Sequence, residues 1–306
     1  PDDEDLNIYQ LNANSGISIF TGQSIIKEHF DDFQNESIEF QKKCTFQYLM
    51  YFDVLISIDL KNKTEDEIYS NFNQNTKRLI NKAIKNNVEI EEIEYKDLER
   101  FKSITLNSSK RVGFHDKSLE YYKIMYKEFV PNNKAKFLIA YLNVKDYLKS
   151  LNDNQKQLEN KLSKLNDKSK KKIVLDDISN IKKRIDEAKI IINEDSDIID
   201  LSAAMFITYG KEVIYAFGGN VDKYMSFNGS HLIQWKMIKY AIENNFEKYD
   251  FYGISGIFDS SDNNYGVYKF KRGFGGNVEE YIGEFTLPIT PYYYINKTIN
   301  KLKGRR

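Results

Sequence analysis

The stretch Phe227-Asn228-Gly229-Ser230-His231 precedes an apolar helical pattern and is a place where this sequence could do chemistry. Backbone N–H groups at the start of a helix bind phosphate, and glycine-rich loops gather several such groups. This stretch has one glycine, whereas a pyrophosphate needs several successive backbone donors. Phe227 and His231 also crowd the approach. We therefore expect no nucleotide pyrophosphate to bind here.

Metal-binding side chains are few and scattered. His29, His115, His231 and the single cysteine, Cys44, do not form a cluster with metal-ligand spacing. We therefore expect neither a metal nor another cofactor. One cysteine cannot form an intramolecular disulfide, so a reducing compartment is the simpler expectation.

The composition is that of a globular protein without a strong global charge. The 306 residues are 41% hydrophobic, which is ample for two domains, and 45 basic residues balance 45 acidic ones. A polyanionic partner must therefore be met by local patches. No stretch approaches the ~20 apolar residues that cross a bilayer. Because the sequence starts at Pro1 without methionine or a leader, we interpret it as a fragment or processed form.

Heptads between Val144 and Ile192 divide the sequence into two parts. Two runs of mostly apolar residues recur every three or four positions, and the polar stretch 166–171 separates them as a tip. This period makes a seam narrow enough for one partner helix, so we predict an antiparallel two-helix coiled-coil arm. A charged connector with chance leucines does not explain a seam in which twelve of thirteen positions are apolar. The seam comprises Val144, Leu148, Leu151, Gln155, Leu158, Leu162, Leu165, Val174, Ile178, Ile181, Ile185, Ala188 and Ile192.

Strand and helix patterns surround this arm. Before it we predict strands at 51–60, 88–93 and 135–141. We also predict four helices there: one starts near Thr64, a second follows and ends at Asn86-Asn87, and two more cover 98–108 and 118–128. After it come strands at 198–209 and 212–217, a helix from Gly229 and a strand at 248–253. Shorter elements are predicted at 16–20, 22–33, 268–271 and 281–285. The order strand, helices, two strands, helix, strand is that of an acetyltransferase-like α/β fold with a mixed sheet, with the arm inserted at a strand-to-strand turn.

Several motifs resemble the Fem peptidoglycan aminoacyltransferases. Leu60, Thr64–Glu67 and the stretch 75–83 are similar to the entry helices of that family. Four later stretches match its C-terminal signature in order and spacing, and its glycyltransferase members carry a helical hairpin at the same insertion point. The resemblance covers about residues 45–300. The four stretches are Gly229–Trp235, Tyr249–Gly256, Gly266–Phe274 and Glu280–Phe285.

This resemblance implies the transfer of an amino acid from aminoacyl-tRNA, with glycyl-tRNA the expected donor, to a stem-peptide amine of a peptidoglycan precursor such as lipid II. The product is the interpeptide bridge of the cell wall. The implied enzyme is cytoplasmic and peripheral to the inner membrane face, and it pairs with a second copy or a related transferase. The reaction is aminolysis of an ester, in which negative charge develops on the carbonyl oxygen.

The resemblance also implies domain boundaries. Residues 1–46 are a remnant of a first acetyltransferase-like lobe, to which 286–306 return. Residues 47–142 and 197–285 form a second such lobe, and residues 143–196 form the arm.

The candidate site residues follow from the same resemblance. Lys271 falls where the family's Phe-Lys pair places a cation in the transfer site, which implies that it stabilises the oxyanion or a phosphate while Phe270 shapes the pocket. Lys117 and Tyr121 match an Arg-x-x-x-Tyr element that binds the precursor's pyrophosphate and sugar. The lysine keeps the charge but loses the bidentate fork. Tyr215 is a weaker substrate-binding candidate. The structural alternatives are a solvated lysine on a strand and a tyrosine at the edge of the core.

Other polar residues are less informative. Asp250, Glu284 and Asp2 are acids for which no role as general base can be assigned, and His115 is more typical of a surface histidine. The outer faces of the arm are rich in cations, which suggests contact with tRNA phosphates, although a solvated face is the commoner explanation. These cations include Lys156, Lys161, Lys164, Lys182, Lys183 and Arg184.

Two other functions stay open at this point. A degenerate acyltransferase fold could bind tRNA or a protein without catalysis, or the protein could be a CoA-dependent N-acyltransferase. Lys271 and Tyr121 favour the aminoacyltransferase, and the single glycine at 229 argues against CoA.

Overall fold

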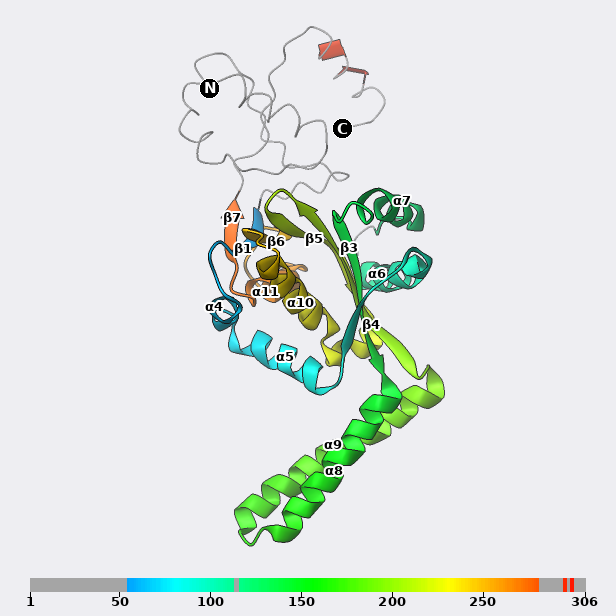
Figure 1. Cartoon of the computed structure of the whole chain (residues 1–306), viewed down its shortest axis with the longest axis vertical. Helices are drawn as coiled ribbons and strands as arrows, with labels where there is room; N and C mark the ends of the chain where they lie inside the picture. The colour runs from blue at the N-terminus through cyan, green and yellow to red at the C-terminus, as the bar shows by residue number, and fades with distance from the viewer. Residues whose placement is uncertain (1–53, 113–115, 281–293, 296–297, 300–306) are drawn as a thin grey trace. The chain divides into compact units, whose positions relative to one another are not determined.

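The computed structural model describes residues 54–112, 116–280, 294–295 and 298–299 (Figure 1). The chain divides into two compact units, of which the larger comprises Ile58–Phe251 and Lys269–Gly276. The elements predicted at 16–20, 22–33 and 281–285 lie outside the described residues, as do Asp2, His115 and Glu284. The predicted domain boundaries therefore stay predictions.

The strands form one mixed sheet in the order β2-β3-β4-β5-β6-β1-β7. Strands β2 to β5 pair antiparallel with their neighbours, β5 and β6 pair parallel, and β1 and β7 pair antiparallel. This arrangement confirms the mixed α/β class predicted from the order of elements. The strands are β1 (Val54–Asp59), β2 (Glu89–Glu92), β3 (Ala135–Asn143), β4 (Ile198–Tyr209), β5 (Glu212–Asn220), β6 (Lys248–Ile254) and β7 (Asn277–Glu280).

Helices cover both faces of the sheet in the larger unit. Figure 1 shows α6 and α7 on one side of β3 and β4, and α5 and α10 on the other. The helices are α4 (Glu65–Ser70), α5 (Gln74–Lys85), α6 (Leu98–Val112), α7 (Leu119–Phe129), α8 (Val144–Lys164), α9 (Lys168–Glu194), α10 (Gly229–Glu243) and α11 (Tyr265–Arg272), and η1 (Tyr95–Asp97) and η2 (Asp222–Phe227) are 3₁₀ turns.

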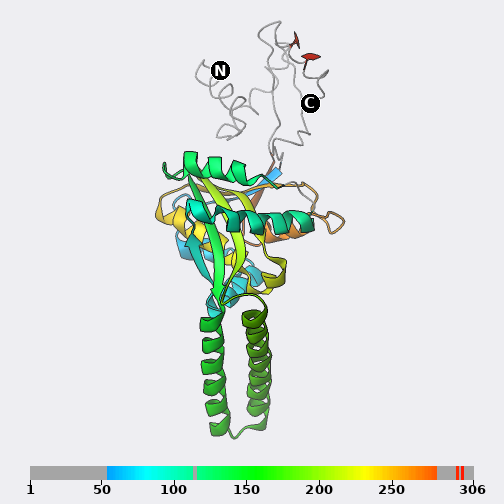
Figure 2. The same cartoon turned by 90° about the vertical axis from the view of Figure 1, so that its right-hand side faces the viewer.

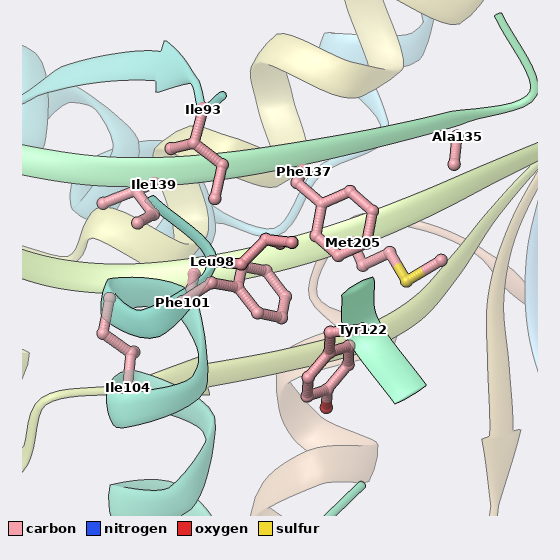
Figure 3. Close-up of a cluster of buried hydrophobic side chains, with 10 residues drawn as sticks. Ile93, Leu98, Phe101, Ile104, Tyr122, Ala135, Phe137, Ile139 and Met205 are labelled. Carbon is pink, nitrogen blue, oxygen red and sulfur yellow. The ribbon is translucent and has the colours of Figure 1, made fainter. Parts of the chain in front are cut away.

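An aromatic and aliphatic core lies between the sheet and helices α6 and α7 (Figure 3). The Phe101 ring meets those of Tyr122 and Phe137 edge-on, each with centroids 5.1 Å apart. Edge-to-face packing of this kind adds to the stabilisation from burying the rings. This core fixes α7, and with it Tyr121, against β5.

Local sequence signals start the helices that hold the site. Thr64 and Glu67 form a reciprocal capping box at α4. The Asn73 side chain caps α5 by accepting a hydrogen bond from the Thr76 N–H at 2.7 Å. The helix start predicted near Thr64 is thus confirmed.

The two-helix hairpin connects β3 to β4, which are antiparallel neighbours, as predicted (Figure 2). Helices α8 and α9 lie side by side in both views, and the predicted seam residues are buried or half-buried. The predicted tip at 166–171 was too long, because α9 begins at Lys168, where Asp167 accepts hydrogen bonds from the N–H groups of Ser169 and Lys170. The supercoil of a true coiled coil stays a prediction.

The base of this hairpin contacts the rest of the larger unit. Arg184 donates to the Asn86 side chain at 2.5 Å and to the Tyr147 hydroxyl at 3.0 Å. The Tyr147 ring meets the Phe227 ring edge-on with centroids 5.5 Å apart. At its base the hairpin is therefore tied to the residue that caps α5 and to η2, by a cation and an aromatic ring, in addition to the contacts between its two helices.

The stretch 268–271 is helical, although its alternation of aromatic and basic residues predicted a strand. It forms the second half of α11. Four alternating residues fit either period, so tertiary packing decides between strand and helix.

Candidate active site

Lys271 is a lysine buried near the end of α11. It is 6% exposed, and Asp250 on β6, at 5% exposed, lies near enough for its negative charge to act on the lysine. Burial lowers the pKa of Lys271 to about 7, and the charge of Asp250 works in the opposite direction. The solvated-lysine alternative is therefore wrong for this residue. Its ammonium and neutral amine are both populated near neutral pH.

A buried lysine is costly for the fold unless its surroundings compensate the charge. A strongly shifted pKa in such a residue marks a candidate functional site, because catalytic acids and bases need values near the working pH. Lys271 meets this criterion on burial and charge together. The sequence motif located it, but only the fold shows that it is shielded from water.

The turn that follows Lys271 docks on the junction of α4 and α5. The Asn73 N–H donates to the Gly273 carbonyl at 2.9 Å, and a side chain at Gly273 would collide with the Thr76 hydroxyl. Gly275 has a φ of +76°, and a Cβ there would lie 2.6 Å from the Asn71 carbonyl. These glycines are needed for close approach and for the left-handed turn. They hold the end of α11, and so Lys271, in place.

Phe270 lies in an aromatic group with His231 and Phe274. Its ring is 4.9 Å from the His231 ring, edge-on, and 5.4 Å from the Phe274 ring. Burial lowers the pKa of His231 to about 4, so this imidazole is neutral at pH 7. Its Nδ1 is buried, with no hydrogen-bond partner among the described residues. Phe270 thus packs against the rings of His231 and Phe274, and its role in shaping a pocket stays a prediction. In the sequence, His231 stands out only as a side chain that crowds the approach of a nucleotide.

Lys117 and Tyr121 form a second group, positioned by other elements. The Lys117 Nζ lies 5.5 Å from the centre of the Tyr121 ring, a cation–π distance. The Tyr121 ring in turn packs edge-on against Phe217 of β5, 5.9 Å away. The structure therefore brings these two predicted residues together.

A buried polar network around Asp116 holds the backbone of Lys117 in place. The Asp116 side chain, 3% exposed, accepts hydrogen bonds from Lys102 Nζ, from the Thr105 hydroxyl at 2.9 Å and from the Tyr122 hydroxyl at 2.8 Å. Lys102 also donates to the Lys117 carbonyl at 2.6 Å. Figure 3 shows the Tyr122 oxygen pointing out of the apolar cluster. In the sequence, Lys102 and Thr105 resemble any polar residues of an amphipathic helix, which is why the network was missed.

Tyr215 lies apart from this second group. A register shift between Met205 and Phe206 leaves Tyr215 opposite Phe206 and Phe217 opposite Met205. Met205 and Phe206 are neighbours in β4 and therefore face opposite sides of the sheet. Each residue of β5 faces the same side as its partner, so Tyr215 and Phe217 point to different faces. Burial raises the pKa of Tyr215 to about 12. The placement favours a core-edge tyrosine over a partner of Tyr121.

The loop before α10 has a structural reason for its glycine. A Cβ on Gly229 would lie 2.8 Å from the Ser202 hydroxyl and 2.9 Å from the Ala140 side chain, so only glycine lets α10 approach the sheet. Asn228 before it adopts a left-handed φ of 61°. Packing thus accounts for Gly229 without a bound phosphate, and the absence of CoA binding there stays a prediction.

The described residues lack two features of other classes of protein. No cluster of three or more His, Cys, Asp or Glu side chains suited to a metal is found in that part of the chain. None of its helices is long and apolar enough to span a bilayer.

Comparisons with known proteins agree with the fold. A model of the FemAB family matches residues 7–301. An aminoacyltransferase FemA of Staphylococcus epidermidis is 34% identical over 262 residues, covering 80% of this chain and 61% of that protein. The FemA of Staphylococcus aureus is 30% identical over 260 residues, covering 81% and 61%. A crystal structure of FemX is similar with a TM-score of 0.69 and 20% identity, covering 88% of this chain and 71% of that one. This chain therefore spans about three fifths of the length of these curated relatives.

Proposed function

Because this chain belongs to the FemAB family, we propose that it transfers an amino acid from aminoacyl-tRNA to a free amine on the stem peptide of a peptidoglycan precursor. This reaction builds the interpeptide bridge. The name aminoacyltransferase, carried by both FemA relatives, supports transfer of an amino acid as the reaction class. The observation that carries the proposal is the buried Lys271 beside Asp250, next to the aromatic group of Phe270.

The chemistry asks for a cation that is shielded from water. The acceptor amine attacks the ester carbon of the charged RNA, the new C–N bond forms, and the C–O bond to the ribose breaks. Between these two steps, in the tetrahedral intermediate, negative charge develops on the carbonyl oxygen. A buried ammonium group stabilises this charge more than a solvent-exposed ammonium group does.

The proton balance fits a lysine with a pKa near 7. The attacking amine must lose a proton, and the departing ribose oxygen must gain one. Lys271 in its protonated form stabilises the oxyanion and hands a proton to the leaving oxygen, and its amine, then neutral, takes up the proton that the attacking amine loses. A single group can do both because efficient acid–base groups have pKa values near the working pH. Asp250 keeps part of the lysine population charged.

The second group is suited to the precursor. Lys117 offers a positive charge to the pyrophosphate, and Tyr121 offers a half-buried ring and hydroxyl to the sugar. The Lys102–Asp116 network orders the backbone that presents Lys117. Tyr215 stays a weaker candidate for substrate contact.

The finer assignments are parts of the same proposal. Glycyl-tRNA is the proposed donor, and a lipid-linked precursor such as lipid II is the proposed acceptor. The protein then works in the cytoplasm at the inner membrane face, and a second copy or a related transferase is its proposed partner in a dimer.

Product analysis tests this function directly. The full-length protein is incubated with mixed charged tRNAs and lipid-linked precursor, and the precursor is weighed by mass spectrometry. We expect a gain of one or more amino acid residues that requires charged tRNA and is lost in Lys271→Ala. An acyl gain that depends on acyl-CoA, or no gain from any donor, contradicts the proposal.

A further inference from the structure

Helix α5 has an unusual distribution of charge. It carries four basic residues, Lys77, Arg78, Lys82 and Lys85, and no acid, in a chain whose total charge is balanced. Arg78, Lys82 and Lys85 are exposed and lie at positions i, i+4 and i+7, so they share one face of the helix. Thr76, Ile80 and Ala83 point the other way and are buried. The basic stripe runs for about 10 Å at ~1.5 Å per residue.

The charges of this stripe are not neutralised within the described part of the chain. Neither Lys77, Arg78, Lys82 nor Lys85 forms a salt bridge with an acid there. Arg78 instead donates to Asn75 and Lys77 to the Ser70 carbonyl, both of which are neutral groups. At least ten basic residues elsewhere pair with carboxylates. Exposed, unpaired cations on one face are free to meet an anionic partner.

The neighbouring helix α10 extends this surface. Lys236 is exposed and donates to the Ile90 carbonyl, and Lys239 lies 5.8 Å from the centre of the Trp235 ring. Trp235 packs on Tyr69 with centroids 5.1 Å apart. Both rings are half-buried. We name the set Lys77, Arg78, Lys82, Lys85, Lys236 and Lys239 the α5–α10 basic surface.

The composition of this surface favours a nucleic acid over a membrane. A helix that lies in a lipid surface exposes several bulky apolar side chains, whereas Ile84, at 52% exposed, is the one large hydrophobic that α5 exposes. Proteins that bind single strands offer exposed aromatic rings for stacking, but Tyr69 and Trp235 are engaged with each other. Cations without free rings suit the phosphates of a duplex, which is read by its backbone.

The position of α5 links this surface to the transfer site. The N–H of its capping residue, Asn73, donates to the carbonyl of Gly273, two residues after Lys271. A duplex lying along α5 would therefore end beside the helix that carries the buried lysine. We propose that the α5–α10 basic surface docks the double-stranded stem of the RNA that donates the amino acid. This inference rests on the proposed function, because it assigns the surface to the donor of that reaction.

The hairpin offers a matched control. Helix α8 carries three exposed lysines in its distal half, Lys156, Lys161 and Lys164, but the same stretch contains Glu159. The triple variants Arg78→Gln/Lys82→Gln/Lys85→Gln and Lys156→Gln/Lys161→Gln/Lys164→Gln remove equal charge from exposed helix faces. Any difference in RNA affinity between the two variants is therefore due to the position of the removed cations and not to the change in net charge.

The test is a titration of each full-length variant with a fluorescent, uncharged RNA stem-loop, followed by anisotropy at 0.05 to about 0.2 M salt, a range in which phosphate contacts dominate. We expect the α5 variant to bind on the order of tenfold more weakly, with a log–log salt slope shallower by about 2. The α8 variant should keep nearly the parent affinity. Equal affinities of the α5 variant and the parent, or a larger loss in the α8 variant, would overturn the inference.

Three further measurements keep the result unambiguous. Vesicles containing anionic phosphatidylglycerol replace the RNA, and a loss in the α5 variant confined to vesicles would assign the surface to membrane and overturn the proposal. If the triple variant does not fold by circular dichroism, the single Lys82→Glu variant takes its place. Lys271→Ala should keep full RNA affinity. RNA binding through α5 without any transfer would sink the proposed function alone, and transfer with normal binding in the α5 variant would sink this inference alone.

Discussion

Lys271 and the lysines of the α8–α9 hairpin carry the same ionisable group in opposite surroundings. Lys271 is buried beside Asp250, and its pKa falls to about 7 because burial penalises the charged form. Lys156, Lys161 and Lys164 on α8 are exposed to solvent. Water screens an exposed charge, so each such lysine contributes little to stability or to chemistry by itself. A single shielded cation can influence a reaction more than many solvated ones.

The comparison is tested most strongly by removing the buried cation. Lys271→Ala should lower turnover by ~10²–10³, about 3–4 kcal/mol of transition-state stabilisation, and change the Michaelis constant little, because the oxyanion exists only during the reaction. Steady-state kinetics with aminoacyl-tRNA and precursor measure both constants. Lys269→Ala, an exposed position on the same helix, is the control. Normal turnover in Lys271→Ala would show that this lysine has no catalytic role.

Burial of Lys271 also predicts how stability depends on pH. Its pKa is about 7 in the folded protein, against 10.5 for a lysine exposed to water, so between these values the unfolded chain binds more protons. Stability conferred by this position therefore rises with pH, by up to about 1.4 kcal/mol per unit between pH 7 and 9. The difference in unfolding free energy between the parent and Lys271→Met, measured in urea, should change by that slope. A flat difference across this range would mean that Lys271 stays protonated in the folded protein and would contradict its lowered pKa.

Lys117 should behave differently from Lys271, because its proposed partner is a phosphate that stays charged throughout the reaction. Lys117→Ala should weaken precursor binding at least about tenfold, because a charged hydrogen bond contributes ~1.5–3 kcal/mol and tenfold is about 1.4 kcal/mol, and it should leave turnover nearly unchanged. Lys117→Arg should tighten binding by restoring a bidentate fork. Calorimetry with the precursor measures both changes. A fall in turnover equal to that of Lys271→Ala would place the two lysines in one role.

The exposed half of the hairpin should have the smallest effect on the fold. Replacing 152–180 with a short Gly/Ser turn keeps the contacts of Tyr147 and Arg184, so we expect a cooperative unfolding transition at nearly the parent temperature. Replacing 146–194 removes those contacts and should cost about 1–3 kcal/mol, the range for breaking buried hydrogen bonds and ring packing. We expect RNA affinity to fall only a few-fold in either protein. Unfolding of the shorter deletion would make the hairpin part of the core.

The sequence predicted some residues of the candidate site and not others. Short motifs identified two pairs of residues that are close in the chain, Phe270 with Lys271 and Lys117 with Tyr121. Asp250 lies 21 positions before Lys271, and its influence on that lysine depends on how β6 and α11 pack. The Lys102–Asp116 network likewise joins residues of α6 to the loop before α7. The bulge that separates Tyr215 from Tyr121 leaves no periodic signal at all.

What the sequence determined by itself is local. Apolar periodicity located the hairpin and the main strands, and Thr64 with Glu67 marked a helix start, because these signals act between residues a few positions apart. The tertiary structure decided the rest: that 268–271 is helical, that the base of the hairpin contacts Asn86 and Phe227, and that Lys271 is buried away from solvent. Burial, and with it the pKa of a lysine, is set by whichever distant segments cover the residue, and no neighbour in the sequence records them.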